Sequence, residues 1–157
     1  VKGYCYTLGI ELMLAADIVI AANDTRFSQL EVKRGIMPTG GATIRMVERA
    51  GWGNAMYFLL TGDEFGADTA LRMNFVQEVV ERGTELARAM EVAENIASQA
   101  PLAVRETMRS AQTALEKNRR AAAREFASAQ SFLLNSADAA EGVASFVERR
   151  PANFLGK

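Results

Sequence analysis

The order of apolar and polar positions divides the chain into two parts. The first, residues 1–80, alternates between short apolar runs rich in β-branched or aromatic residues and segments with a helical period. Strand-like runs lie at 1–6, 17–22, 25–29 and 75–80, and helical patterns lie at 8–16, 42–51, 54–62 and 66–74. Strands that alternate with helices are typical of an α/β fold with a largely parallel sheet.

The second part, residues 81–157, has helical patterns throughout. It opens at Thr84, a residue type that favours the helix N-cap. Helical stretches run from 85 to 100, from 101 to 134 and from 137 to 150. The spacing of Leu, Met and Phe suits helices that pack on each other or on a partner. We therefore predict an α/β core at 1–80 and an appended helical subdomain at 81–157.

A glutamate lies inside the most apolar stretch of the chain, TLGIELMLAADIVI at 7–20. The residues around Glu11 leave no polar face on a helix at 8–16, and a helix that is apolar all round is buried. Burial of a carboxylate is unfavourable unless it is paired, protonated or used in chemistry. Glu11 is therefore either a satisfied core acid near a helix N-terminus or a functional group, and the pattern favours neither.

Other charged or glycine-rich segments have simpler structural interpretations. Glu31 lies beside Lys33 and Arg34 in SQLEVKRG, a pattern typical of a solvated surface. The segment TGGAT at 39–43 opens a helix, and its N–H groups can meet an anion or simply form a tight turn. The two arginines before Pro151 are typical of a helix C-terminus, where cations meet the helix dipole.

Composition narrows the chemistry. The 157 residues carry 18 basic and 19 acidic side chains, so no basic field attracts nucleic acid or an anionic membrane, and no apolar run is long enough to span a bilayer. The absence of histidine excludes Ser-His-Asp and Cys-His catalysis within this chain, and the single Cys5 cannot form an intrachain disulfide or a zinc site. We therefore expect no bound metal. Any acid–base chemistry would be carried out by Glu, Asp, Lys or Tyr, and we expect the protein to be cytoplasmic.

A long pattern covers residues 2–51, KGYCYTLGIELMLAADIVIAANDTRFSQLEVKRGIMPTGGATIRMVERAG. With LTGDEFGADTALRMNFVQEVV and DAAEGVASFVERRPANF further along, it resembles the crotonase superfamily, in particular enoyl-CoA hydratase-like members. The residues that carry the resemblance are Gly9, Glu11, Ala16, Asp17, Phe27, Glu31, Gly35, Pro38 and Gly41. The resemblance implies a spiral of β-β-α units, here without its N-terminal part, and a helical oligomerisation subdomain at 81–157 that builds homotrimers or dimers of trimers.

The resemblance also implies roles for individual residues. Glu11 and Glu31 fall on the family's two catalytic glutamates. The backbone N–H of Leu8, a position where the family often has glycine, falls on one of two oxyanion-hole donors, and the other donor lies upstream of Val1. The implied substrate-binding residues are Leu8, Gly9, Gly41 and Arg149.

Two glutamates favour the addition of water to a 2-enoyl-CoA thioester over the other reactions of the superfamily. One carboxylate takes a proton from water and the other supplies a proton at Cα, while the oxyanion hole holds the charge on the thioester oxygen. No separate cofactor is expected, because coenzyme A is part of the substrate. An enoyl-CoA isomerase, which needs one carboxylate, and a non-catalytic assembly or CoA-ester-binding protein remain as alternatives. Because the chain opens in a strand without an initiator Met, we expect a C-terminal portion that is inactive alone.

Overall fold

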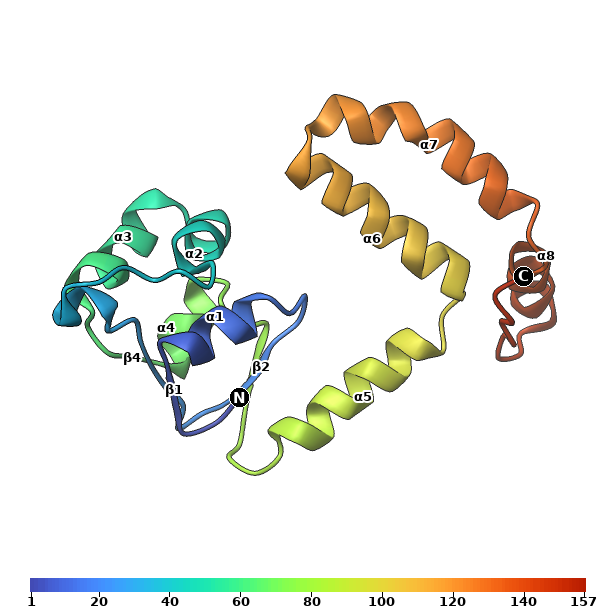
Figure 1. The fold of residues 1–157 in the computed structure, drawn as a ribbon. Helices are drawn as coiled ribbons and strands as arrows, with labels where there is room; N and C mark the ends of the chain where they lie inside the picture. The colour runs from blue at the N-terminus through green and yellow to red at the C-terminus, as the bar shows by residue number, and fades with distance from the viewer. The chain divides into compact units, whose positions relative to one another are not determined.

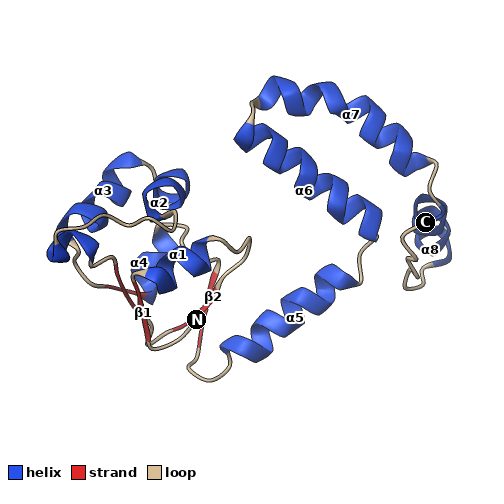
Figure 2. Ribbon diagram, in the orientation of Figure 1, coloured by secondary structure: helices blue, strands red, loops and turns tan.

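The computed structural model describes residues 1–157, which form two compact units, Val1–Glu91 and Val92–Lys157 (Figure 1). Every strand lies in the first unit, and the second unit is helical (Figure 2). Helix α5, Glu85–Ala97, begins in the first unit and ends in the second. None of the helices combines the length and the apolar character that crossing a membrane requires.

Short strands and helices alternate along the first unit, which confirms the α/β pattern predicted from the sequence. The elements in chain order are β1 Tyr4–Tyr6, α1 Leu8–Leu14, β2 Ile20–Ala22, β3 Arg26–Ser28, the 3-10 helix η1 Glu31–Arg34, α2 Ala42–Ala50, α3 Trp52–Thr61, β4 Phe65–Gly66, α4 Ala67–Arg72 and β5 Glu78–Val80. Helices α2 and α3 each end at a glycine with a positive φ, Gly51 and Gly62, a conformation that glycine adopts without strain.

The strands form two small sheets. β1 pairs in parallel with β3, with Tyr6 opposite Ser28, and β4 pairs antiparallel with β3. β2 and β5 form a separate parallel pair. The strand predicted at 17–22 begins only at Ile20 in the structure. Val19, just before it, is bound on both sides by Gln77, because its N–H donates to Gln77 Oε1 at 2.8 Å and its carbonyl accepts from the Gln77 N–H at 2.9 Å.

Aromatic side chains fill the core of the first unit. The ring of Phe27 on β3 stacks on that of Phe65, with 5.4 Å between centroids. Phe58 and Phe75 also pack on Phe65, at centroid distances of 4.4 and 5.9 Å. Because buried aromatic rings remove large apolar areas from water, this cluster anchors the strand that precedes Glu31.

Helix α1 is buried on one side only, so the expectation of a helix buried all round was wrong. Ile10, Met13 and Leu14 face the core, whereas Leu8 is 68% exposed and Leu12 is 72% exposed. The exposed leucines are four residues apart and therefore share one face of the helix. A binary pattern cannot identify this face, because both sides of the helix carry apolar side chains.

The second unit contains the end of α5 and three further helices, α6 Pro101–Glu116, α7 Arg119–Leu134 and α8 Ala137–Glu148. The sequence predicts an uninterrupted helical stretch from 101 to 134, but the chain turns at Lys117 and Asn118 so that α6 and α7 lie side by side (Figure 1). The Asn118 side chain caps α7, because its Oδ1 accepts a hydrogen bond from the Ala121 N–H at 3.0 Å. Asn is a strong N-cap, and it begins a new helix here.

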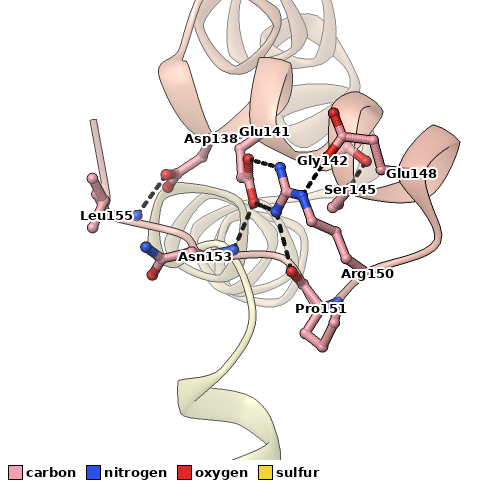
Figure 3. Close-up of polar contacts among 9 residues, drawn as sticks. All are labelled: Asp138, Glu141, Gly142, Ser145, Glu148, Arg150, Pro151, Asn153 and Leu155. Atoms are coloured by element: carbon pink, nitrogen blue, oxygen red, sulfur yellow. Dashed lines mark hydrogen bonds and ion pairs between the residues drawn. The ribbon is translucent and has the colours of Figure 1, made fainter.

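The last seven residues, 151–157, fold back along α8 (Figure 3). The buried Asp138 carboxylate accepts hydrogen bonds from the N–H groups of Leu155, at 2.7 Å, and Gly156, at 2.9 Å. In return, the Asp138 N–H donates to the Lys157 carbonyl at 3.2 Å. These contacts hold residues 151–157, the C-terminal segment, against the start of α8.

Candidate active site

Glu11 is buried, with 6% of its surface exposed, and its carboxylate meets the N-terminus of α2. The Oε1 atom accepts hydrogen bonds from the Gly40 N–H at 2.7 Å and from the Ala42 N–H at 3.2 Å. N–H groups at a helix N-terminus lack partners within the helix, and the helix dipole favours negative charge there. The anion that meets the TGGAT segment in this chain is therefore the carboxylate of Glu11 itself.

Gly40 allows this close approach. A Cβ atom on Gly40 would lie 2.8 Å from Cδ of Glu11, a separation that real Cβ atoms essentially never show. The second carboxylate oxygen, Oε2, accepts no hydrogen bond from the chain. One oxygen of Glu11 is thus fixed by two backbone donors, and the other has no hydrogen-bond partner within the chain.

The turn before α1 presents two unused backbone donors. The N–H groups of Leu8 and Gly9, the first two residues of α1, donate no hydrogen bond within the chain. Thr7, the N-cap, has a φ of 48° and a ψ of −115°, in a region that favours glycine. Its N–H donates to the Ser28 carbonyl at 2.9 Å, and this bond ties the turn to the end of β3.

Glu31 begins η1, three residues after β3 ends at Ser28. Its side chain is half-buried, and its Oε2 is buried without a hydrogen-bond partner. Because β1 and β3 are parallel neighbours with Tyr6 opposite Ser28, the segments that carry Glu11 and Glu31 leave the sheet at the same edge. Both glutamates therefore follow the carboxyl ends of adjacent parallel strands, the usual place for a ligand site in an α/β sheet. The sequence around Glu31 predicts a solvated side chain, and this prediction is wrong for Oε2, which is buried.

Gln29 was missed by the sequence analysis. It is fully buried, and neither its amide oxygen nor its amide nitrogen has a hydrogen-bond partner. Buried amides are normally satisfied, so this side chain is exceptional. No local pattern signals its burial, since Gln29 is the last residue of the strand-like run at 25–29 and lies just after β3 in the structure.

The glycines implied as substrate-binding residues are both close to side chains of this chain. A Cβ atom on Gly9 would lie 3.3 Å from the Cys5 sulfur, whose burial raises the pKa of that thiol. Gly41 has a φ of +108°, and a Cβ atom there would lie 3.1 Å from Cζ of Arg45. The structure therefore explains each of these glycines by packing within the chain, and their contact with a substrate stays a prediction.

Arg149 lies in the second unit, where it ends α8 with a φ of 54°. Its side chain is exposed and makes no hydrogen bond or ion pair. The neighbouring Arg150 instead binds Glu141, with Nη1 2.6 Å from Oε1 and Nη2 2.8 Å from Oε2, and also pairs with Glu148 (Figure 3). Hydrogen bonds from Arg150 and from the Asn153 N–H lower the pKa of Glu141 to about 2.

Comparison with known protein families identifies the chain. A family model described as enoyl-CoA hydratase/isomerase matches residues 1–157. The chain belongs to the enoyl-CoA hydratase/isomerase family. This result confirms the resemblance to the crotonase superfamily that the sequence showed.

Individual members of the enoyl-CoA hydratase/isomerase family match along the whole chain. A crotonyl-CoA hydratase from Syntrophomonas wolfei is 34% identical over 157 residues, which are 100% of this chain and 60% of that protein. The 2,3-dehydroadipyl-CoA hydratase of Escherichia coli is 29% identical over 157 residues, 100% of this chain and 62% of that protein. The chain thus spans about 60% of the length of these relatives.

Solved structures of the enoyl-CoA hydratase/isomerase family confirm the predicted crotonase-like α/β fold. A probable enoyl-CoA hydratase/isomerase from Mycobacterium abscessus superposes with a TM-score of 0.97 at 48% identity, covering 99% of this chain and 61% of that one. An enoyl-CoA hydratase from Mycobacterium tuberculosis gives a TM-score of 0.93 at 37% identity, covering 99% of this chain and 62% of that one.

Proposed function

We propose that this chain supplies both acid–base carboxylates and one oxyanion donor of an enoyl-CoA hydratase that adds water to 2-enoyl-CoA thioesters. The observation that carries the proposal is the Glu11 carboxylate, whose Oε1 is held by the N–H groups of Gly40 and Ala42 while Oε2 accepts no hydrogen bond. With Oε1 held by two N–H groups, the carboxylate keeps its orientation, and Oε2 can transfer a proton from a fixed position, as general acid–base catalysis requires.

Hydration needs a balanced pair of proton transfers. One glutamate takes a proton from water as the water oxygen bonds to Cβ of the enoyl group, and the other delivers a proton to Cα. The unpartnered Oε2 of Glu31 supports its assignment as the second carboxylate, because a buried acceptor without a partner gains a hydrogen bond when water or substrate enters. After reaction each glutamate returns to its starting state by passing on the proton it gained or regaining the one it lost.

The free backbone donors at the start of α1 support the oxyanion role. Negative charge develops on the thioester oxygen as water adds, and donors that are already oriented stabilise that charge. The Leu8 N–H is unused within the chain, and the same helix carries Glu11 one turn later. Because the donor belongs to the backbone, the Leu side chain in place of the family's common glycine does not remove it.

The names of the relatives support the substrate class. The matched hydratases are named for crotonyl-CoA and 2,3-dehydroadipyl-CoA, and a further relative is a carnitinyl-CoA dehydratase that is 32% identical. The acyl groups in these three names differ, but each name describes an ester of coenzyme A. We therefore propose an acyl-CoA substrate, with no separate cofactor, for the protein that contains this chain.

Product analysis separates hydration from its alternatives. The complete protein that carries this segment is incubated in D₂O with crotonyl-CoA and, separately, with 3-hexenoyl-CoA, and the products are identified by mass spectrometry. The proposal predicts 3-hydroxybutyryl-CoA labelled at Cα. Conversion of 3-hexenoyl-CoA to the 2-enoyl isomer without hydration of crotonyl-CoA would favour an isomerase, and binding without turnover would favour a non-catalytic protein.

A further inference from the structure

The two glycines before α2, Gly40 and Gly41, which we call the diglycine turn, lie between two opposite charges. Gly40 packs against the Glu11 carboxylate, and Gly41 packs against the guanidinium group of Arg45. Arg45 is a half-buried residue in the first half of α2, and its side chain turns back toward the helix N-terminus. A side chain on either glycine would displace one of these charged groups.

Gly40 is held from both ends of its backbone. Its N–H donates to Glu11 Oε1 at 2.7 Å, and its carbonyl accepts a hydrogen bond from Arg45 Nη1 at 3.0 Å. Glycine has more backbone freedom than other residues, so a diglycine turn does not fix the direction of its own N–H groups. The hydrogen bond from Arg45 removes this freedom at the residue that holds the carboxylate.

We propose that Arg45 is a positioning residue for Glu11, which acts by fixing the diglycine turn whose N–H groups hold Oε1. This inference rests on the proposed function, because it matters for activity only if Glu11 transfers a proton. A small displacement of a catalytic group lowers the rate without loss of the fold, so the role of Arg45 should appear in kcat. Arg45 does not touch the carboxylate by hydrogen bond or ion pair, and its effect is transmitted through the backbone of Gly40.

A second arginine on the same helix provides a matched control. Arg49 Nη2 donates to the carbonyls of Leu14, at 3.2 Å, and Ala16, at 2.6 Å, at the C-terminal end of α1. Arg45→Met and Arg49→Met therefore each remove a guanidinium group that binds backbone carbonyls, but only Arg45→Met releases the diglycine turn. Arg45→Lys keeps a positively charged donor of different shape, and it tests whether such a donor restores the hydrogen bond to the Gly40 carbonyl.

The first experiment measures amide hydrogen exchange at Gly40 by NMR in the complete protein, corrected for global stability. The loss of a hydrogen bond from a charged donor is worth about a tenfold change in local opening, so we expect exchange at Gly40 to accelerate about tenfold in Arg45→Met. Exchange in Arg49→Met should stay within about twofold of the wild type, and Arg45→Lys should lie between the two. Unchanged exchange at Gly40 in Arg45→Met would overturn the proposal.

The second experiment measures hydration of crotonyl-CoA by the complete protein. We expect Arg45→Met to lower kcat about tenfold with KM within about twofold, and Arg45→Lys to recover part of kcat. Faster exchange at Gly40 with unchanged kcat would overturn the positioning role. Failure of the proposed function is read independently from Glu11→Gln, since wild-type turnover in that variant removes Glu11 from the chemistry whatever Arg45 does.

Discussion

Glu11 shows how a chain can place a carboxylate in its most apolar stretch. The group is not paired with a cation, and its burial is compensated by two backbone N–H groups at the start of α2. Hydrogen bonds from backbone N–H groups to a charged acceptor are stronger than neutral ones, so they offset part of the desolvation. The structural and functional interpretations that the sequence left open are therefore compatible, because one oxygen is satisfied and the other is not.

At the scale of single residues, the sequence located the glutamates but not their partners. The hydrogen bond between Glu11 and Gly40 joins residues 29 positions apart, and no local pattern encodes it. The unpartnered amide of Gln29 was missed for the same reason, since burial of a polar residue after a strand depends on tertiary packing. The resemblance supplied roles for Glu11 and Glu31 that pattern alone did not favour.

Thr7 provides a test of backbone strain beside the candidate site. Its φ of 48° with ψ of −115° suits glycine, and its side chain makes no capping hydrogen bond that glycine would lose. We expect Thr7→Gly to stabilise the chain by about 1 kcal/mol, which is the lower end of the range for one strained residue. Thermal and denaturant unfolding measure the change. Thr7→Ala keeps a Cβ and should give no gain, and an equal gain from both substitutions would contradict the assignment of strain to the Cβ.

Gly40 tests whether the position of the Glu11 carboxylate matters. A Cβ at Gly40 would collide with the carboxylate, so Gly40→Ala must move one or the other. We expect kcat for crotonyl-CoA hydration by the complete protein to fall about 10²-fold, the scale of a displacement near 1 Å. Gly53→Ala, in α3, meets no atom within 4 Å and is the control, with activity unchanged and stability slightly raised. Equal activity in the two variants would contradict the expected effect.

At the scale of elements, helical segments were predicted better than strands. The strands are two or three residues long, and the runs predicted at 17–22 and 75–80 shorten to Ile20–Ala22 and Glu78–Val80, ends that β propensity does not mark. The break between α6 and α7 was missed because Asn118 lies in a strongly charged, helix-favouring sequence, and only its capping geometry separates the two helices. The end of α8 before Pro151 agreed with the sequence to within two residues.

The contact between α8 and the C-terminal segment predicts a pH dependence. Arg150 and the Asn153 N–H hold the pKa of Glu141 at about 2, below its ordinary value of 4.5. Because the folded pKa is depressed, the stabilisation is fully present above pH 4.5 and is lost as the pH falls toward 2. We expect Glu141→Gln to lower the unfolding temperature at pH 7 and to have progressively less effect below pH 4.5.

The control is Glu116→Gln, at an exposed glutamate without an ion pair, which should not change the unfolding temperature at either pH. A Glu141→Gln effect that is constant with pH would contradict the ion-pair account.

At the scale of the whole molecule, the second unit carries more apolar surface than its own helices cover. The large apolar side chains exposed there are Ile96, Met108, Leu115, Phe126, Phe132, Leu134, Val143, Phe146, Val147 and Leu155. A groove of about 670 Å³ also lies between α6 and α7, lined in part by Ala111, Ala122 and Phe126. Exposed apolar surface of this extent marks interaction sites.

We therefore expect the complete protein to self-associate through residues 81–157, as the trimers implied by the resemblance would require. Sedimentation velocity at micromolar concentration measures the outcome directly. Phe126→Glu and Phe132→Glu introduce charge into the apolar surface and should shift the distribution toward smaller species, while Glu94→Gln on the exposed side of α5 should leave it unchanged. A wild-type protein that sediments as a single monomeric species would contradict this prediction.

The carboxylate of Glu11, in the proposed reaction, transfers a proton during hydration of a 2-enoyl-CoA. The most direct test is kcat for crotonyl-CoA hydration by Glu11→Gln in the complete protein. The amide oxygen of Gln can still accept the hydrogen bonds from Gly40 and Ala42, so we expect the turn to keep its fold while the side chain loses its negative charge and its ability to exchange a proton. We expect a loss of about 10²–10⁴-fold in kcat, the range for a positioned acid or base. Turnover near the wild-type value in a correctly folded Glu11→Gln variant would contradict it.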